Sequence, residues 1–351
     1  MGNLKYKLIR AGMELFALPG VSNLIRSFSA SRGVFFTMHR VLPGVPAAFS
    51  PNSILQITPE FLEETILACR AQNVDIVDID EALRRLSSQQ RENRFAVFSF
   101  DDGYKDNLEF ALPILRKHNC PFTLYIATNL IEAKAEVWWQ AIEDIIANSD
   151  AIEFDFGKGV KQYSTQSISA KWECFDEIYD FMREAPEAER LEKLTSFAKA
   201  YGLDLEQHCR DLIMDWEELQ NFIDEPLCTI GAHTVNHYEL KKLSSEAMRA
   251  EIQQSVEILT KKTGSVPTHF SYPVGGNRSA GRREFAAVKE LGLHSGVTTR
   301  PGGLYKENAE FPNALPRVSI NGNYQKKRFL NVFLTGAIFT THSGGKKVNH
   351  S

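Results

Sequence analysis

The sequence predicts an α/β fold: a (β/α) barrel of seven to eight mostly parallel strands, with a helical insertion. Two observations favour this fold. Short apolar runs alternate with longer amphipathic ones, and several short runs are apolar throughout, as in strands that are buried on both faces. The 351 residues, 43% of them hydrophobic and 24% charged, are sufficient for one large globular domain.

Eight runs rich in Val, Ile, Phe and Thr are the predicted strands. They cover residues 33–39, 74–79, 95–100, 122–126, 227–232, 268–272, 295–299 and 315–320. Amphipathic helices are predicted between them over 58–71, 108–117, 244–263 and 282–291. Thr58-Pro59 is typical of a capped helix start, and Gly264 and Gly292 each follow a helix end.

The chain divides into three predicted parts. Residues 1–32 form an N-terminal helical segment, residues 33–322 form the barrel, and residues 323–351 form a C-terminal tail whose last part, from 343, is expected to be disordered. Within the barrel, residues from about 138 to 224 have helical patterns and little strand signal, which indicates an insertion after the fourth strand.

The N-terminal segment carries basic residues around short apolar runs but no clear cleavage site. We therefore expect no cleaved signal peptide and a cytoplasmic protein. This segment packs on the domain as an ordinary helix or, alternatively, anchors weakly to the inner face of the membrane. The net charge of −4 disfavours nucleic acid as a partner. Five scattered cysteines without a CxxC pair indicate free thiols.

Two polar motifs follow predicted strands. Asp101 and Asp102 end an apolar run just before Gly103, and His233 and His237 follow another strand at a spacing that predicts one face of a helical turn. Carboxyl ends of parallel strands share one rim of a barrel, where reactive residues lie. One carboxylate with two histidines can hold a metal and leave a coordination position open. The other carboxylate is then free to act as a base.

These motifs resemble those of the polysaccharide deacetylases, the carbohydrate esterase family 4 with its NodB homology domain. Residues 98–104 (FSFDDGY) resemble the family's first motif, and residues 233–237 (HTVNH) resemble its second. Residues 270–276 (FSYPVGG) resemble a variant of its third. The resemblance implies a distorted (β/α) barrel that uses one divalent metal to remove acetyl groups from N-acetylated sugars.

The resemblance also implies roles for individual residues. Asp102, His233 and His237 are the expected metal ligands, and Asp101 is the expected general base. Zinc is the first choice of metal because histidine and carboxylate suit it, although the same ligands accept iron, cobalt or nickel. Thr234 is expected to hold one of the imidazole rings in place.

A backbone N–H near Tyr272, Pro273 or Val274 is expected to bind substrate by stabilising the oxyanion. The family's third motif has an arginine where this chain has Ser271. Arg317, on a later strand, could replace that arginine beside Asp101, or it is an ordinary surface residue.

The family's usual acid histidine has no good match near the C-terminus. His39, at the end of the first strand, resembles the acid histidine of circularly permuted members, and His294 is the alternative. Trp138 and Trp139, at the start of the insertion, either stack on sugar rings or anchor the inserted helices.

The leading interpretation is a metal-dependent sugar N-deacetylase that acts on an N-acetylated sugar, an oligosaccharide or a lipid-linked glycan of surface-polysaccharide synthesis. An O-acetyl esterase, a deformylase and a non-catalytic carbohydrate-binding barrel are the alternatives. A glycosidase fits less well, because its two carboxylates must lie about 5–9.5 Å apart across the bond that is cut. The sequence indicates no protein partner.

Overall fold

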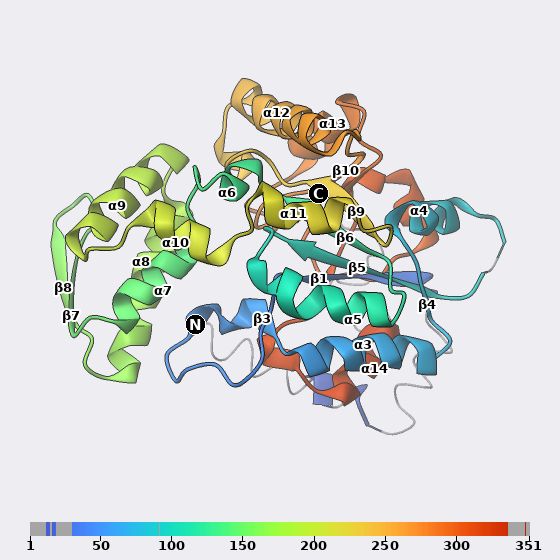
Figure 1. Ribbon diagram of the computed structural model, residues 1–351, viewed down its shortest axis with the longest axis horizontal. Coiled ribbons are helices and arrows are strands. Elements are labelled where there is room, and N and C mark those ends of the chain that lie inside the picture. Colours follow the sequence, from blue (N-terminus) through green and yellow to red (C-terminus); the bar gives the residue numbers. More distant parts are fainter. Residues whose placement is uncertain (1–11, 15, 19–29, 91, 336–347, 349–351) are drawn as a thin grey trace.

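The computed structural model describes residues 12–14, 16–18, 30–90, 92–335 and 348. Within them, a curled parallel sheet is surrounded by helices (Figure 1), and the predicted distorted barrel is confirmed. The strands of this sheet are β1 (Gly33–Met38), β4 (Asp75–Ile76), β5 (Phe95–Asp101), β6 (Phe122–Ile126), β9 (Cys228–Ala232), β10 (His269–Ser271), β11 (Ser295–Val297) and β12 (Val318–Ser319).

Seven of these strands form a continuous path in the order β11-β10-β9-β6-β5-β1-β12, and β4 pairs with the start of β5. Each of these pairings is parallel. An isolated parallel bridge between Val297 and Leu315 links the two ends of the path. The carboxyl ends of the strands therefore lie along one rim of the barrel.

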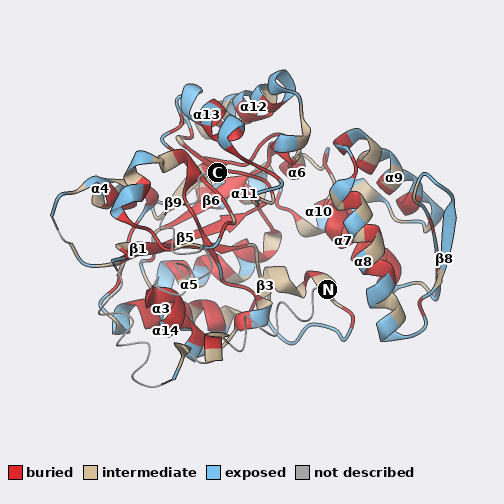
Figure 2. Ribbon diagram, turned by 180° about the vertical axis from the view of Figure 1, so that it is seen from behind, coloured by how far each residue is buried: buried red, intermediate tan, exposed pale blue. Residues whose placement is uncertain are grey.

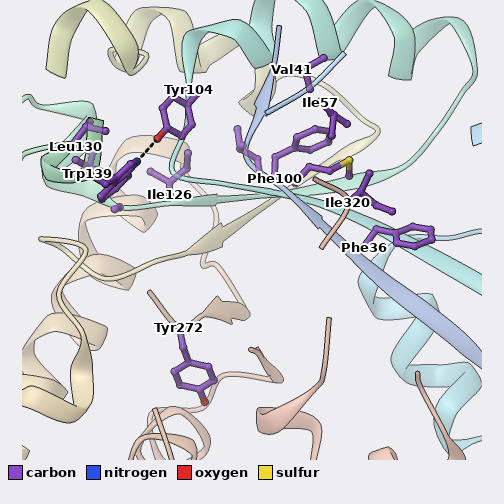
Figure 3. Close-up of a cluster of buried hydrophobic side chains, with 14 of the residues drawn as sticks. Phe36, Val41, Ile57, Phe100, Tyr104, Ile126, Leu130, Trp139, Tyr272 and Ile320 are labelled. Carbon is purple, nitrogen blue, oxygen red and sulfur yellow. Dashed lines mark hydrogen bonds between the residues drawn. The ribbon is translucent and has the colours of Figure 1, made fainter. Parts of the chain in front are cut away.

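The central strands are buried on both faces, which explains their uninterrupted apolar runs. Phe36 packs edge-to-face on Phe98 with ring centroids 5.5 Å apart, and Phe100 packs in the same way on Phe122 at 6.0 Å. Each such pair contributes about 0.5–1.5 kcal/mol beyond the burial of its area. Figure 2 shows the sheet as the most buried layer, and Figure 3 shows part of this core.

The barrel helices cover the outside of the sheet, with α3, α5 and α14 on one side of it and α12 and α13 on the other (Figure 1). The predicted caps are present. The Thr58 hydroxyl accepts a hydrogen bond from the Phe61 N–H at 3.2 Å, and Gly264 ends a helix in the left-handed conformation. The barrel helices are α3 (Pro59–Ala71), α4 (Ile79–Ser87), α5 (Leu112–Lys117), α6 (Thr128–Ile131), α12 (Ser245–Thr263), α13 (Arg282–Glu290) and α14 (Lys327–Thr335).

Shorter elements complete the barrel. They are the strands β2 (Arg40–Val41) and β3 (Gln56–Ile57), the π-helical turn η2 (Asn107–Ala111), and the 3₁₀ turns η1 (Pro51–Leu55), η3 (Leu240–Lys242), η4 (Lys306–Glu310), η5 (Pro312–Ala314) and η6 (Gly322–Tyr324).

The predicted strand at 74–79 is largely wrong. Only β4 is extended there, and Ile79 already begins helix α4, which the sequence pattern did not indicate. The cause is Asp78, whose side chain accepts a hydrogen bond from the Glu81 N–H at 2.8 Å. This cap starts the helix and ends the extended segment.

Helix α11 (Trp216–Ile223), the last helix of the predicted insertion, packs against β9 and belongs to the barrel, and the residues before it, 138–212, form a helical lobe beside the barrel (Figure 1). The lobe also contains an antiparallel hairpin, made of β7 and β8, for which little strand signal was found. In β7 the buried residues Ile152 and Phe154 alternate with exposed ones, the pattern of a half-buried strand. The elements of the lobe are α7 (Trp138–Ala147), β7 (Ala151–Asp155), β8 (Val160–Ser164), α8 (Ile168–Glu184), α9 (Glu187–Ala200) and α10 (Leu205–Leu212).

The expected C-terminal tail contains helix α14, which packs against α3 through an apolar face that includes Phe329 and Leu330. Residues from 343 onward lie outside the described part, except 348, as does most of the N-terminal segment. Of that segment, Met13 is buried and Glu14 pairs with Arg328 of α14 at 2.7 Å. Among the described residues, no helix is both long and apolar enough to span a bilayer.

Candidate active site

The first motif turns the chain at the carboxyl end of β5. Asp101 is the last residue of that strand, and Asp102 follows in a left-handed conformation with a φ of 78°. Gly103 continues the turn at a φ of 84°, and a Cβ at this position would lie 3.0 Å from the Ile131 side chain. This turn keeps both aspartates inside the rim, where each is 2% exposed.

The second motif follows β9 as a loop, so the helical turn expected from its spacing is wrong. Thr234 and His237 both have positive φ angles, 68° and 56°, which interrupt any helix. The loop begins where the His233 N–H donates to the Ile126 carbonyl at 2.9 Å. Despite the different backbone, His233 and His237 meet, with ring centroids 4.9 Å apart.

The structure brings Asp102, His233 and His237 together at the rim. One potential ligand atom from each lies within 4.8 Å of the others, and all three side chains are buried. The Asp102 Oδ1 atom is 3.4 Å from His233 Nε2 and 3.2 Å from His237 Nε2, yet it forms no well-aligned hydrogen bond with any described residue. An unpaired buried carboxylate oxygen between two imidazoles fits a divalent cation, which would satisfy all three side chains.

The orientation of His233 supports the same interpretation. Its Nδ1 atom lies 2.7 Å from the Ser271 carbonyl oxygen. Because that oxygen can only accept, Nδ1 carries the proton, and the Nε2 lone pair is left for the site. The expectation for Thr234 is wrong, since its hydroxyl has no hydrogen-bond partner among the described residues.

The electrostatics of these side chains favour their metal-binding protonation states. Burial opposes ionisation of Asp102, but His237 and His233 outweigh it and hold the pKa of this carboxyl well below its usual range. Burial lowers the pKa of His237, although Asp102 opposes the shift. Both shifts favour deprotonated groups, and those are the forms that bind a metal.

Asp101 is held away from this cluster by Arg317. The guanidinium donates from Nη1 to Oδ1 at 2.7 Å and from Nη2 to Oδ2 at 2.6 Å, a bidentate pair. Burial raises the pKa of Asp101, but Arg317 outweighs this effect and the pKa lies below its usual value. Arg317 is fully buried, so the alternative of a surface arginine is wrong.

Two serines complete the contacts of this ion pair. Ser271 accepts from Arg317 at 2.9 Å and donates to Asp101 at 3.2 Å, and Ser99 accepts from Arg317 at 3.1 Å. Neither serine was singled out as part of the site from the sequence. A usable signal existed for Ser99, because residues two apart on a strand share a face and Asp101 is two positions further along β5.

His39 lies at the same rim, directly after β1. Its backbone carbonyl accepts a hydrogen bond from the Asn107 side chain at 2.9 Å, and the residue is partly exposed. Strand β1 pairs with β5 in a register that places Met38 opposite Phe100, so His39 follows at the level of Asp101. After the larger effects of burial and of closer partners, His39 also lowers the pKa of both Asp101 and Asp102. This position suits a group that exchanges a proton with substrate.

His294 does not belong to this site. It directly precedes β11, and its exposed ring lies 6.0 Å from that of His269, the first residue of β10. Both histidines therefore lie at the amino ends of the strands, whereas Asp101 lies at a carboxyl end. The alternative assignment of His294 as the acid is wrong for this reason.

The two tryptophans of α7 are buried, at 4% and 6% exposure, which favours the anchoring interpretation over sugar stacking. Trp138 packs against Tyr179 of α8 with ring centroids 5.2 Å apart. Trp139 contacts the site itself, because its ring centroid is 5.0 Å from that of His237. The Trp139 indole also donates to the Tyr104 hydroxyl at 2.9 Å (Figure 3). Trp139 thus forms a wall of the site.

Three residues of the third motif were expected to supply a backbone donor. The Tyr272 N–H donates to the Val297 carbonyl at 3.1 Å, and Pro273 has no N–H. Val274 has a φ of 60°, which is strained for a β-branched residue, and its N–H has no acceptor among the described residues. Of the three residues expected to stabilise an oxyanion, only Val274 can therefore supply the N–H. Tyr272 instead packs against Phe285 of α13 with ring centroids 5.1 Å apart, and its hydroxyl donates to the Asn313 carbonyl at 2.8 Å.

Comparison with known proteins agrees with this geometry. The family model described as polysaccharide deacetylase matches residues 88–155 and 172–295, more than half of the chain. A curated relative, "Putative polysaccharide deacetylase YxkH" of Bacillus subtilis (strain 168), is 29% identical over 93 residues. That match covers 26% of this chain and 32% of the relative, so it spans about a third of the relative's length.

Solved structures share the fold. Streptococcus pyogenes deacetylase PplD in complex with acetate superposes with a TM-score of 0.51 at 16% identity, covering 86% of this chain and 97% of that one. IcaB from Ammonifex degensii superposes with a TM-score of 0.53 at 15% identity, covering 86% and 98%. At such low identity the similarity shows the fold alone.

Proposed function

The chain belongs to the polysaccharide deacetylase family, and we propose that it is a metal-dependent hydrolase that removes an N-acetyl group from a sugar. One observation carries the proposal. The buried cluster of Asp102, His233 and His237 lies beside a second carboxylate, Asp101, which pairs with Arg317 and stays outside the cluster.

In the proposed reaction each residue has one task. A divalent metal held by Asp102, His233 and His237 would act as a Lewis acid that polarises the acetyl carbonyl and activates water. Asp101 accepts the proton of the attacking water, since its lowered pKa keeps it ionised at neutral pH. The Val274 N–H donates to the developing oxyanion, and His39 protonates the departing amine.

We propose zinc as the metal, because one carboxylate and two imidazoles leave room for water in a tetrahedral zinc site. The proposed substrates are an N-acetylated sugar in a polysaccharide, an oligosaccharide or a lipid-linked glycan precursor. Iron, cobalt or nickel would suit the same donors.

The experiment measures acetate release from a panel of N-acetylated sugars, free and lipid-linked, with and without a chelator. We expect release that stops with the chelator and returns when zinc is added. Release that resists the chelator, with no metal in the purified chain, would contradict the proposal. Formate release, or acetate release from O-acetyl esters only, would assign the same site to a deformylase or an esterase.

Replacing a ligand provides the matching variant. His233→Ala is expected to abolish stoichiometric metal binding, because it removes one of three protein donors. Elemental analysis of the purified protein measures this directly. Unchanged metal content would reject the assignment of His233 as a ligand.

His39→Ala is expected to lower kcat by about 10²–10⁴-fold, the usual contribution of a general acid, while the metal content stays the same. His294→Ala is the control, because His294 lies at the opposite end of the strands and should leave kcat unchanged. The proton-donor role of His39 would be excluded by a kcat close to that of the unmodified chain. Loss of metal from the His39 variant would instead identify His39 as a ligand or a structural group.

A further inference from the structure

The loop between the two histidine ligands has an unusual backbone. Thr234 is β-branched and has a φ of 68°, and His237 has a φ of 56°. Such conformations are costly for residues other than glycine, and they persist only where surrounding contacts hold them. The loop presents both imidazoles, so the contacts that hold it also set the geometry of the metal site.

One side of the loop is held by a buried carboxylate on helix α12. The Glu251 Oε2 atom accepts from the Val235 N–H at 3.0 Å and from the Asn236 N–H at 2.9 Å. The Glu251 Oε1 atom accepts from the Asn236 side-chain amide at 2.6 Å. Glu251 is 9% exposed. Both of its carboxylate oxygens therefore accept hydrogen bonds from the loop.

The opposite side of the loop is held by the start of α6. The Asn129 side-chain amide donates to the Asn236 side-chain oxygen at 2.7 Å, and the Asn129 N–H donates to the Val235 carbonyl at 2.8 Å. The Thr128 N–H donates to the Thr234 carbonyl at 3.2 Å. Helix α12 packs against both α6 and β9, so Glu251 approaches the loop from a rigid support.

We propose that Glu251 is a positioning residue for the metal site: it holds the loop of residues 234–236 so that His233 and His237 converge on one ion. The inference rests on the proposed function. Groups that orient metal ligands typically contribute 10–100-fold to metal affinity. Because the carboxylate acts through backbone N–H groups, an amide oxygen in its place retains part of the effect.

The test compares zinc affinities of the metal-free full chain by competition with a fluorescent chelator. Glu251→Ala is expected to weaken zinc binding by about 10–100-fold. Glu251→Gln should weaken it less, since its oxygen can still accept from the two backbone N–H groups. Glu257→Ala is the control, because Glu257 lies exposed on the same helix and its side chain accepts a hydrogen bond from Gln253, away from the loop. Its affinity should equal that of the unmodified chain.

The outcomes separate the two proposals. An unmodified chain that binds no zinc would overturn the proposed function and this inference together. Zinc binding that is equally tight in the unmodified chain and in Glu251→Ala would overturn this inference alone. The same holds if Glu257→Ala weakens zinc binding as much as Glu251→Ala does. Thermal melting of the metal-free variants tests folding. If Glu251→Ala does not fold, the graded effect is measured with Glu251→Gln and Asn236→Ala, and unchanged affinity in both contradicts the inference.

Discussion

Asp101→Asn is expected to lower kcat by about 10²–10⁴-fold, the usual contribution of a general base, while the metal content stays unchanged. An asparagine amide cannot accept the proton of the attacking water. The three atoms that could hold the metal come from Asp102, His233 and His237, and none of them is altered. Steady-state kinetics with elemental analysis of the same preparation measures both quantities.

The adjacent variant Asp102→Asn is the matched control. It makes the same chemical change one position along the chain, at a residue whose carboxylate faces the two histidines. We expect it to lose the metal, whereas Asp101→Asn retains it. Nearly normal turnover in Asp101→Asn would remove Asp101 from the role of base. Equal metal loss in both variants would show that the two carboxylates do not have separate tasks.

Arg317→Met is expected to lower the free energy of unfolding by about 3–5 kcal/mol, the usual effect of removing one partner from a buried ion pair. Arg317 is fully buried, and methionine supplies no donor to Asp101, so the carboxylate is left unpaired inside the barrel. The pKa of Asp101 should then rise, because burial opposes ionisation and Arg317 is its largest opposing influence. Urea denaturation measures the loss of stability.

The double variant Asp101→Asn/Arg317→Met tests whether this loss arises from the pair. Each single change leaves one buried charge without its partner, whereas the double change removes both charges. The double variant should therefore be more stable than the sum of the single effects predicts, by about 0.5–3 kcal/mol of coupling. Strict additivity would show that the effect of Arg317 comes from its packing instead.

The catalytic rim could be predicted from the sequence because its signals are local. Asp101 and Asp102 lie at the end of a strand that is visible as an apolar run, and His233 and His237 follow another such strand. Parallel strands then place both motifs at one rim without further information. The partner of Asp101 gave no comparable signal, because Arg317 lies 216 residues away and only closure of the barrel brings it near. For the same reason, the sequence left open whether Arg317 lies buried beside Asp101 or at the surface.

Elements whose patterns are short or ambiguous were missed. The period-two alternation of β7 spans only five residues within a strongly helical region, and α4 begins at a capping aspartate inside an apolar run. Glu251 looks like any polar residue of an amphipathic helix, since its partners are backbone groups of a distant loop. Backbone acceptors and donors are the same in almost every residue, so the sequence does not show which of them a side chain contacts.

The contact of Trp139 with His237 has a consequence for engineering. Because the Trp139 indole of α7 both contacts His237 and donates to Tyr104, the lobe of residues 138–212 cannot be exchanged without changing the site. A chimera that imports another lobe to alter substrate choice would also open one imidazole face to water. Grafts should therefore begin after the first turn of α7, so that the native tryptophan remains with the histidine it covers.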